Sequence, residues 1–282
     1  MTLVDALVHA AVVGAAMVLP ISASGHGAVT RIWRGQDAAW AELAVAIGLG
    51  AAIAMAVAVR SRLGPAGRAL GANLAKPSRL ATQEPGREAI AVVIAATAST
   101  AVAMLVAGPI ERALDSPTAV GLGLLLTALA LGTTAAAPAP KRICPTAWGS
   151  LWLGLAHGLG TAPGVSRIGA AFVVANWLGV RGWRAAEFAL MVTAATASVD
   201  AARGAWALPD AALLARSHTA IGLVVALIAA SLAAQAWRWL SERRRTLWLV
   251  AWLVPLAVAT LGYSRAAPTP QRPAAAAENI GR

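Results

Sequence analysis

Charged residues are scarce in this sequence of 282 residues: they make up 12% of it, about half the share found in an ordinary soluble domain. The single cysteine, Cys144, excludes an internal disulfide and fits no metal-binding motif. The first seven residues contain Asp5 but no Lys or Arg, so we expect no cleaved secretory signal there. The scarcity of charge argues against a soluble domain.

Apolar residues are abundant, at 59% of the chain with a mean hydropathy of +0.68. A helix that crosses the ~30 Å hydrocarbon core of a bilayer needs about 20 such residues, and uncharged runs of that length recur. The sequence therefore predicts an all-α polytopic membrane protein. Six spans are predicted, at 40–59, 89–108, 118–137, 185–208, 219–237 and 246–263.

The formal net charge is +11, but its distribution argues against a nucleic-acid partner. Four connections between the apolar runs hold 14 of the 23 Lys and Arg residues. Positive charge marks cytoplasmic loops in membrane proteins. We therefore expect the connection from Arg60 to Arg87, with the other three, to face the cytoplasm.

Two further apolar segments, 6–33 and 147–180, are each interrupted near the middle by proline and glycine. Each must return to the side from which it entered, because otherwise the basic loops would lie on opposite faces. We therefore predict two re-entrant helical hairpins, each followed by three spans. This is an odd number of crossings, so the halves have opposite orientations, as in an inverted-topology repeat. The predicted units are a first repeat (1–140), a second repeat (141–263) and a disordered tail (264–282).

The two interruptions carry polar residues in a similar order. The first reads "LPISASGH" (19–26) and the second "APGVSRIG" (162–169). Irregular backbone at membrane depth survives only where it is buried in protein or lines a wet cavity, and a charge there needs a partner. The helix N-termini that follow add backbone N–H groups. The tips therefore predict a phosphate or diphosphate site formed by Ser22, Ser24, His26, Ser166 and Arg167.

Simpler interpretations exist for each of these residues taken alone. Ser22 or Ser24 is more often a helix cap than a ligand, His26 can be an interfacial histidine, and Arg167 can extend to the lipid headgroups. The pairing of two similar tips in corresponding halves favours a binding site.

Other polar residues have less specific signals. His157, six residues before Pro163, is open between a structural and a functional role. Glu187 and Asp200 are expected as buried partners of Arg203. The 11 tryptophans are expected at the membrane interfaces, without a chemical role.

At these tips the sequence resembles the undecaprenyl-pyrophosphate phosphatases that confer bacitracin resistance. The family's first motif ends in Leu-Pro-Val-Ser-Ser-Thr-Gly-His, which residues 19–26 resemble, and its second reads Pro-Gly-Phe-Ser-Arg-Ser-Gly, which residues 163–169 resemble. Further similarity follows Glu42 and occurs in "RAAEF" at 184–188. By resemblance, the catalytic residues are His26, Arg167 and Ser24, and the substrate-binding residues are Ser22, Gly25, Gly164, Ser166, Gly169 and His157.

The resemblance implies hydrolysis of undecaprenyl diphosphate to the monophosphate carrier of cell-wall synthesis, at the outer face of a bacterial inner membrane. It also implies Mg²⁺ or Ca²⁺. However, Val13 and Met17 stand where the family's first hairpin has glutamates, and Ala23, Ile168 and Ala171 stand where it has hydroxyl residues. Because Mg²⁺ is held by carboxylates and phosphate oxygens, we expect no metal ligand from the hairpins.

Two functions from different classes follow. The first is a polyprenyl-diphosphate phosphatase in which Arg167 neutralises charge, His26 attacks or acts as an acid, and His157 replaces the lost base. The second is a catalytically impaired homologue that binds or moves a polyprenyl phosphate. An unrelated small-solute transporter fits the repeat but not the tips. The expected partners are the lipid substrate and the bilayer, with a homodimer left open. Glu42 or Glu187 is the alternative source of a carboxylate.

Overall fold

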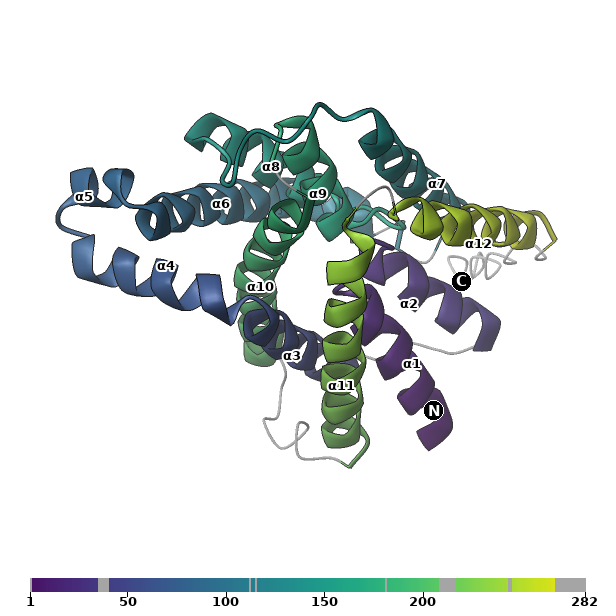
Figure 1. The fold of residues 1–282 in the computed structure, drawn as a ribbon. Coiled ribbons are helices and arrows are strands. Elements are labelled where there is room, and N and C mark those ends of the chain that lie inside the picture. Colours follow the sequence, from purple (N-terminus) through teal and green to yellow (C-terminus); the bar gives the residue numbers. More distant parts are fainter. Residues whose placement is uncertain are drawn as a thin grey trace, which may run out of the picture.

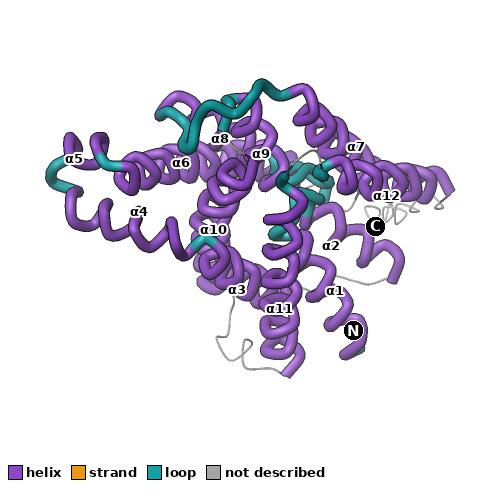
Figure 2. The backbone as a smooth tube through the Cα atoms, in the orientation of Figure 1, coloured by secondary structure: helices purple, strands orange, loops and turns teal. Residues whose placement is uncertain are grey.

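The computed structural model describes residues 2–34, 41–111, 113–114, 116–180, 182–207, 217–242 and 245–266. These residues form helices and turns and no strand, apart from a parallel bridge between Arg142 and Val180, as Figure 2 shows. The helices are α1 (Leu3–Ala16), α2 (Ala23–Arg34), α3 (Ala41–Ala58), α4 (Arg60–Asn73), α5 (Pro77–Thr82), α6 (Glu84–Glu111), α7 (Pro117–Thr133), η1 (Thr134–Ala136), α8 (Ala147–Leu159), α9 (Arg167–Trp177), α10 (Gly182–Ala207), α11 (Ser217–Leu240) and α12 (Leu247–Ala266).

The predicted all-α polytopic architecture is confirmed. Five helices in the described part of the chain, α6, α7, α10, α11 and α12, are long and apolar enough to cross a membrane. A sixth candidate is α3 taken together with α4, although these two helices are bent by 87° from one another. Trp40 and Leu208, the ends of two predicted spans, lie outside the described residues, as do residues 267–282 of the predicted tail. The first residues of that tail continue α12 as far as Ala266.

Both predicted hairpins consist of two short helices that pack against each other, α1 with α2 and α8 with α9 (Figure 1). These helices have 14, 12, 13 and 11 residues. At ~1.5 Å per residue, each is about 17 to 21 Å long, which is too short to cross the ~30 Å core alone. The opposite orientation of the two halves stays a prediction.

The basic connection from Arg60 to Arg87 is more structured than the sequence suggested. It contains α4 and α5, which extend to one side of the molecule beside the start of α6 (Figure 1). Pro77 occupies the first turn of α5, where proline's missing N–H is tolerated. The connection is therefore a pair of helices.

Helices from the two predicted repeats pack closely through small residues. α1 and α3 both lie against α11, α6 lies against α8, and α7 lies against α12. A Cβ at Gly14 of α1 would lie 2.8 Å from the Cα of Ala226 in α11, and one at Gly50 of α3 would lie 2.6 Å from the carbonyl oxygen of Leu223. Small residues permit such close approach between membrane helices. Both clusters of buried hydrophobic residues consequently include residues of the two repeats.

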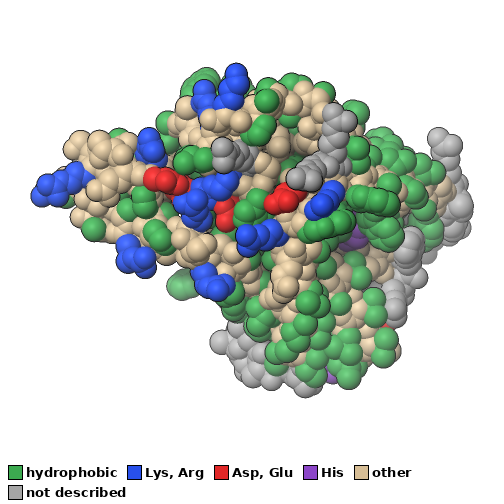
Figure 3. Space-filling model, viewed as in Figure 1, with side chains coloured by type: hydrophobic (Ala, Val, Ile, Leu, Met, Phe, Trp, Pro, Cys, Tyr) green, Lys and Arg blue, Asp and Glu red, His purple; other side chains and the backbone are tan. Residues whose placement is uncertain are grey.

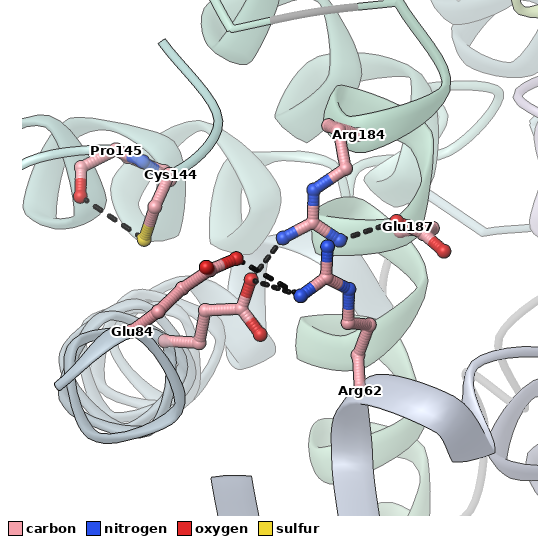
Figure 4. A network of polar contacts seen from close by, with 7 residues as sticks. Arg62, Glu84, Cys144, Pro145, Arg184 and Glu187 are labelled. Carbon is pink, nitrogen blue, oxygen red and sulfur yellow. Dashed lines mark hydrogen bonds and ion pairs between the residues drawn. The ribbon is translucent and has the colours of Figure 1, made fainter. Parts of the chain in front are cut away.

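A partly buried network of charges also joins the two predicted repeats (Figure 4). Arg184 of α10 forms ion pairs with Glu88 of α6 and with Glu187 one turn away. Arg62 of α4 lies 3.0 Å from Glu84 and 3.7 Å from Glu88. The prediction that Glu187 pairs with Arg203 was wrong. Glu187 pairs instead with Arg184, which lies three residues before it on the same helix. On the face of the molecule shown in Figure 3, basic and acidic side chains gather close to one another.

The thiol of Cys144 lies beside this network, outside the spanning helices (Figure 4). Burial, reinforced by the negative charge of Glu88, raises the pKa of the thiol to about 11. The reactive thiolate is therefore scarce near neutral pH. Cys144 should therefore react only slowly with maleimides, so that a newly introduced cysteine can be detected in its presence.

We predict that a cysteine at Ser116, which lies just before the candidate span Pro117–Ala136, reacts with a membrane-impermeant maleimide on intact cells, whereas one at Gly71 reacts only after permeabilisation. A Cβ at Gly71 would meet no atom within 4 Å, and serine and cysteine are nearly the same size, so both substitutions are expected to preserve the fold. Both thiols are expected to react at least tenfold faster than Cys144 at pH 8, because Gly71 is exposed, Ser116 is half-buried, and an ordinary thiol ionises near pH ~8.5. Labelling of Gly71→Cys from outside, with none at Ser116→Cys, would contradict the topology.

Candidate functional site

The tip of the first hairpin is a strained turn held by its own side chains. Ser22 has a φ of +74°, the only positive φ of a non-glycine residue in the described part of the chain. Its hydroxyl oxygen accepts a hydrogen bond from the Gly25 N–H at 3.0 Å, so it caps α2. Its carbonyl oxygen accepts two more from His26, from the backbone N–H at 3.1 Å and from Nδ1 at 2.9 Å. These bonds hold the strained conformation.

The second tip has the same cap and an additional clamp from α7. The Ser166 hydroxyl accepts from the Gly169 N–H at 3.0 Å, as Ser22 does from Gly25. The single proton of the buried Thr127 hydroxyl is shared between the carbonyl oxygens of Gly123 and Gly164, and the hydroxyl oxygen accepts from the Ser166 N–H, each at 3.0 Å. Thr127 therefore satisfies backbone groups that the break in the helix leaves unpaired.

The two tips contact each other through glycines. A Cβ at Gly25 would lie 3.2 Å from the Cα of Gly164, and one at Gly169 would lie 3.3 Å from the carbonyl oxygen of Pro20. Gly164 also has a φ of +74°, a conformation that glycine adopts at little cost. The prediction that the tips meet in space is thus confirmed by their packing.

A cavity of about 520 Å³ lies beside both tips. Ser24, Ser166 and Arg167 line it, whereas Ser22 and His26 do not. Its other walls are mainly apolar and come from α1, α2, α3 and α10. Val13 and Met17, which stand at the glutamate positions of the motif, form part of the α1 wall. The cavity is within the size range of small-molecule sites.

Arg167 has a carboxylate partner that the sequence analysis assigned elsewhere. Its Nη1 donates to Oδ2 of Asp200, on α10, at 2.7 Å. The prediction that Asp200 pairs with Arg203 was wrong, and Arg203 is exposed. The Nε of Arg167 is buried and has no hydrogen-bond partner among the described residues. The guanidinium therefore retains donor capacity for an anion.

Both ring nitrogens of His26 are occupied within the protein. Because a carbonyl can only accept, Nδ1 carries the proton that is donated to Ser22. Nε2 accepts from the indole N–H of Trp252, on α12, at 3.0 Å. His26 thus anchors the first tip to α12. Trp252 therefore supports the tip through a structural hydrogen bond, and the expectation that the tryptophans have no chemical role stays a prediction.

His157 is fully buried on α8 and lies outside the cavity lining. The Thr193 hydroxyl donates to the Ala189 carbonyl, so it accepts from Nε2 of His157 at 2.9 Å. Nδ1 then accepts from the Ser99 hydroxyl at 2.7 Å. Of the two roles left open for His157, this geometry supports the structural one.

Two cavity residues were missed by the sequence analysis, His9 and Arg31. His9 is the only one of the four histidines, all in the described part of the chain, that lines the cavity. Its Nδ1 lies 2.7 Å from the Thr30 hydroxyl oxygen, which itself donates to the Gly27 carbonyl, so Nδ1 is the donor. The signal for His9 was available, because it lies four residues before Val13 on the same helical face.

The donors that the described residues place around the cavity do not fit a divalent metal ion. Asp200 is the only carboxylate of a described residue in the lining, and a cation bound to it would lie next to the Arg167 guanidinium. The described residues contain no group of three His, Cys, Asp or Glu side chains that could hold a metal. The side chain of Glu42, an alternative carboxylate, lies outside the described residues. Glu187 is engaged with Arg184.

Comparison with known proteins decides the relationship that the tips suggested. A sequence model of the bacitracin resistance protein BacA matches residues 6–259. The chain belongs to the BacA family. A relative from Acaryochloris marina (strain MBIC 11017), named undecaprenyl-diphosphatase, is 27% identical over 197 residues, which cover 68% of this chain and 72% of that protein. The residues matched by the family model include both predicted hairpins, 6–33 and 147–180.

In this BacA-family protein, we predict that Thr127→Val destabilises the fold by about 1–3 kcal/mol, the cost of leaving buried backbone groups unpaired. Thr260→Val is the matched control. Thr260 is equally buried on α12, but its hydroxyl bonds only the carbonyl of Leu256 one turn earlier. Thermal unfolding in detergent should show a clear loss for Thr127→Val and little change for Thr260→Val. Equal melting temperatures would contradict the clamp.

Proposed function

We propose that this protein binds the diphosphate group of a polyprenyl diphosphate in the cavity between the hairpin tips and hydrolyses it to the monophosphate. The observation that carries the proposal is the position of Arg167, which lines a largely apolar cavity where the tips of both hairpins meet. The family membership and the name of the relative support the same substrate.

The cavity suits an amphiphilic phosphate ester. Guanidinium groups recognise phosphate oxygens through paired hydrogen bonds, and the hydroxyls of Ser24 and Ser166 lie in the same lining. The apolar walls would bury prenyl units near the headgroup. We place the protein in the inner membrane of a bacterium, where the monophosphate carries cell-wall precursors.

Hydrolysis requires that one bond forms, that one bond breaks and that the attacking water loses a proton. The oxygen of a water molecule bonds to the terminal phosphorus, the bond from that phosphorus to the bridging oxygen breaks, and the bridging oxygen stays on the polyprenyl monophosphate. Arg167 stabilises the charge that develops on the phosphate oxygens. The water also loses a proton, for which the cavity offers the imidazole of His9. Inorganic phosphate is the second product.

We predict that Arg167→Ala lowers the affinity for polyprenyl diphosphate at least tenfold and abolishes phosphate release, since a buried charge-assisted contact contributes about 2–5 kcal/mol. Arg203→Ala, an exposed arginine of α10, is the control and should retain both properties. Binding in detergent and phosphate release with purified protein are the measurements. An unchanged affinity for Arg167→Ala, with the fold intact, would place the anion elsewhere.

The histidines allow a second prediction. His9→Asn should lower kcat by about 10² or more, the usual contribution of a proton-transfer group, with KM unchanged. His26→Ala should abolish activity, because it removes the bonds that shape the first tip. Trp252→Phe, which removes only the indole donor to His26, should lower kcat less than threefold. Normal turnover by His9→Asn would exclude it as the proton acceptor.

A second candidate function is binding or translocation of a polyprenyl phosphate without hydrolysis. Its specific support is that Val13 and Met17 leave the α1 wall without a carboxylate, while both nitrogens of His26 are bonded. Lipid binding that depends on Arg167, with no phosphate release under any condition, would favour this function.

A further inference from the structure

The cavity contains a second arginine from the opposite hairpin. On α2, Ser24, Gly27 and Arg31 are spaced by three and four residues and all line the cavity, so they share one face of the helix. A Cβ at Gly27 would lie 3.5 Å from Nη1 of Arg31 and 3.8 Å from Cε1 of His9. Arg31 and His9 therefore lie together on the wall that the first hairpin forms.

Arg167 reaches the same cavity from the second hairpin. Two guanidinium groups thus line the same cavity, and Arg167 also forms an ion pair with Asp200. A guanidinium has five N–H donors, so each arginine can bind a phosphate oxygen in addition to its contacts within the protein. A diphosphate matches this arrangement because it carries two adjacent anionic groups.

We propose that Arg31 is the second phosphate-binding residue of this cavity, so that Arg31 and Arg167 each hold one phosphate group of a diphosphate. The inference rests on the proposed function for the class of ligand. It assigns to a side chain the charge neutralisation that a divalent ion would otherwise supply, and the described donors around the cavity do not form a site for such an ion. Arg31 occupies the same hairpin wall as Val13 and Met17, where carboxylates are missing.

This arrangement selects diphosphate over monophosphate. A diphosphate engages both arginines, whereas a monophosphate can engage only one of them at full strength. Cleavage of the bridging bond therefore removes one of the two contacts to the lipid. The product is expected to bind more weakly than the substrate, which favours its release.

The test compares three probes in detergent with EDTA present: a methylene-bridged farnesyl diphosphate analogue that water cannot cleave, farnesyl monophosphate, and inorganic diphosphate. The wild type should bind the bridged analogue at least tenfold more tightly than the monophosphate, the effect of about one charge-assisted hydrogen bond. Arg31→Gln should reduce this ratio below threefold and leave monophosphate affinity unchanged. Arg31→Lys should give an intermediate ratio, because lysine keeps the charge but not the planar fork.

Arg68→Gln is the matched control, because Arg68 is an exposed arginine of α4 outside the cavity. It should leave every affinity unchanged. Thermal melting identifies a variant that fails to fold, in which case Arg31→Lys decides the result. Inorganic diphosphate should bind more weakly than the bridged analogue, because it lacks contact with the apolar walls. Equal affinity would overturn a lipid as the ligand.

A ratio unchanged by Arg31→Gln, or a wild-type ratio near one, would overturn the role of Arg31. A ratio that appears only when Mg²⁺ replaces EDTA would overturn it as well, because a metal would then supply the discrimination. These outcomes concern binding affinity only and do not depend on whether the protein hydrolyses the diphosphate. Tight binding that depends on Arg31, without phosphate release, would sustain this inference and contradict hydrolysis.

Discussion

The arrangement of the two hairpins depends on satisfying irregular backbone at membrane depth. Where a helix breaks inside a bilayer, its free N–H and C=O groups find no water and must bond to protein. Ser22 and Ser166 satisfy one N–H at the start of each second helix. Thr127 satisfies the carbonyl of Gly164 and the N–H of Ser166 from outside the hairpin. The tips can therefore meet at the side of a cavity.

The same packing constrains the chemistry of the site. Glycines allow the tips to touch, and the first residue of α9, Arg167, then lies in the cavity with its charge balanced by Asp200. The bonds that support the tips also occupy His26, which joins Ser22 to Trp252. Residues that belong to the motif therefore divide into those that shape the tip and those that face the cavity. Ser24, Ser166 and Arg167 face the cavity, and Ser166 belongs to both groups because it also caps α9.

Hydropathy, charge distribution and the position of proline and glycine were sufficient to predict the all-α membrane fold, the two broken segments and the meeting of their tips. These signals are local in sequence. The bonds of Thr127 and Trp252 to the tips, and the pairing of Arg167 with Asp200, join residues that are far apart in the chain. No spacing rule reveals such contacts. The helical character of α4 and α5 was missed because high charge and glycine content hid it.

His9 and Arg31 were predictable only in part from the sequence. Each lies at a helical spacing from a motif residue, His9 from Val13 and Arg31 from Ser24, so the face was predictable. That this face borders a cavity became visible only in the packed structure. The wall that contains Val13 and Met17 in place of carboxylates expected from the resemblance thus also contains two basic groups, His9 and Arg31.

The central claim is that the cavity between the tips holds a diphosphate group. An experimental structure of the protein with the methylene-bridged farnesyl diphosphate analogue tests it most directly. The account predicts density for two phosphate groups in the cavity, one within hydrogen-bond distance of Arg167, and prenyl density along the apolar walls. Phosphate density outside this cavity, for example at the basic residues of α4 and α5, would contradict it.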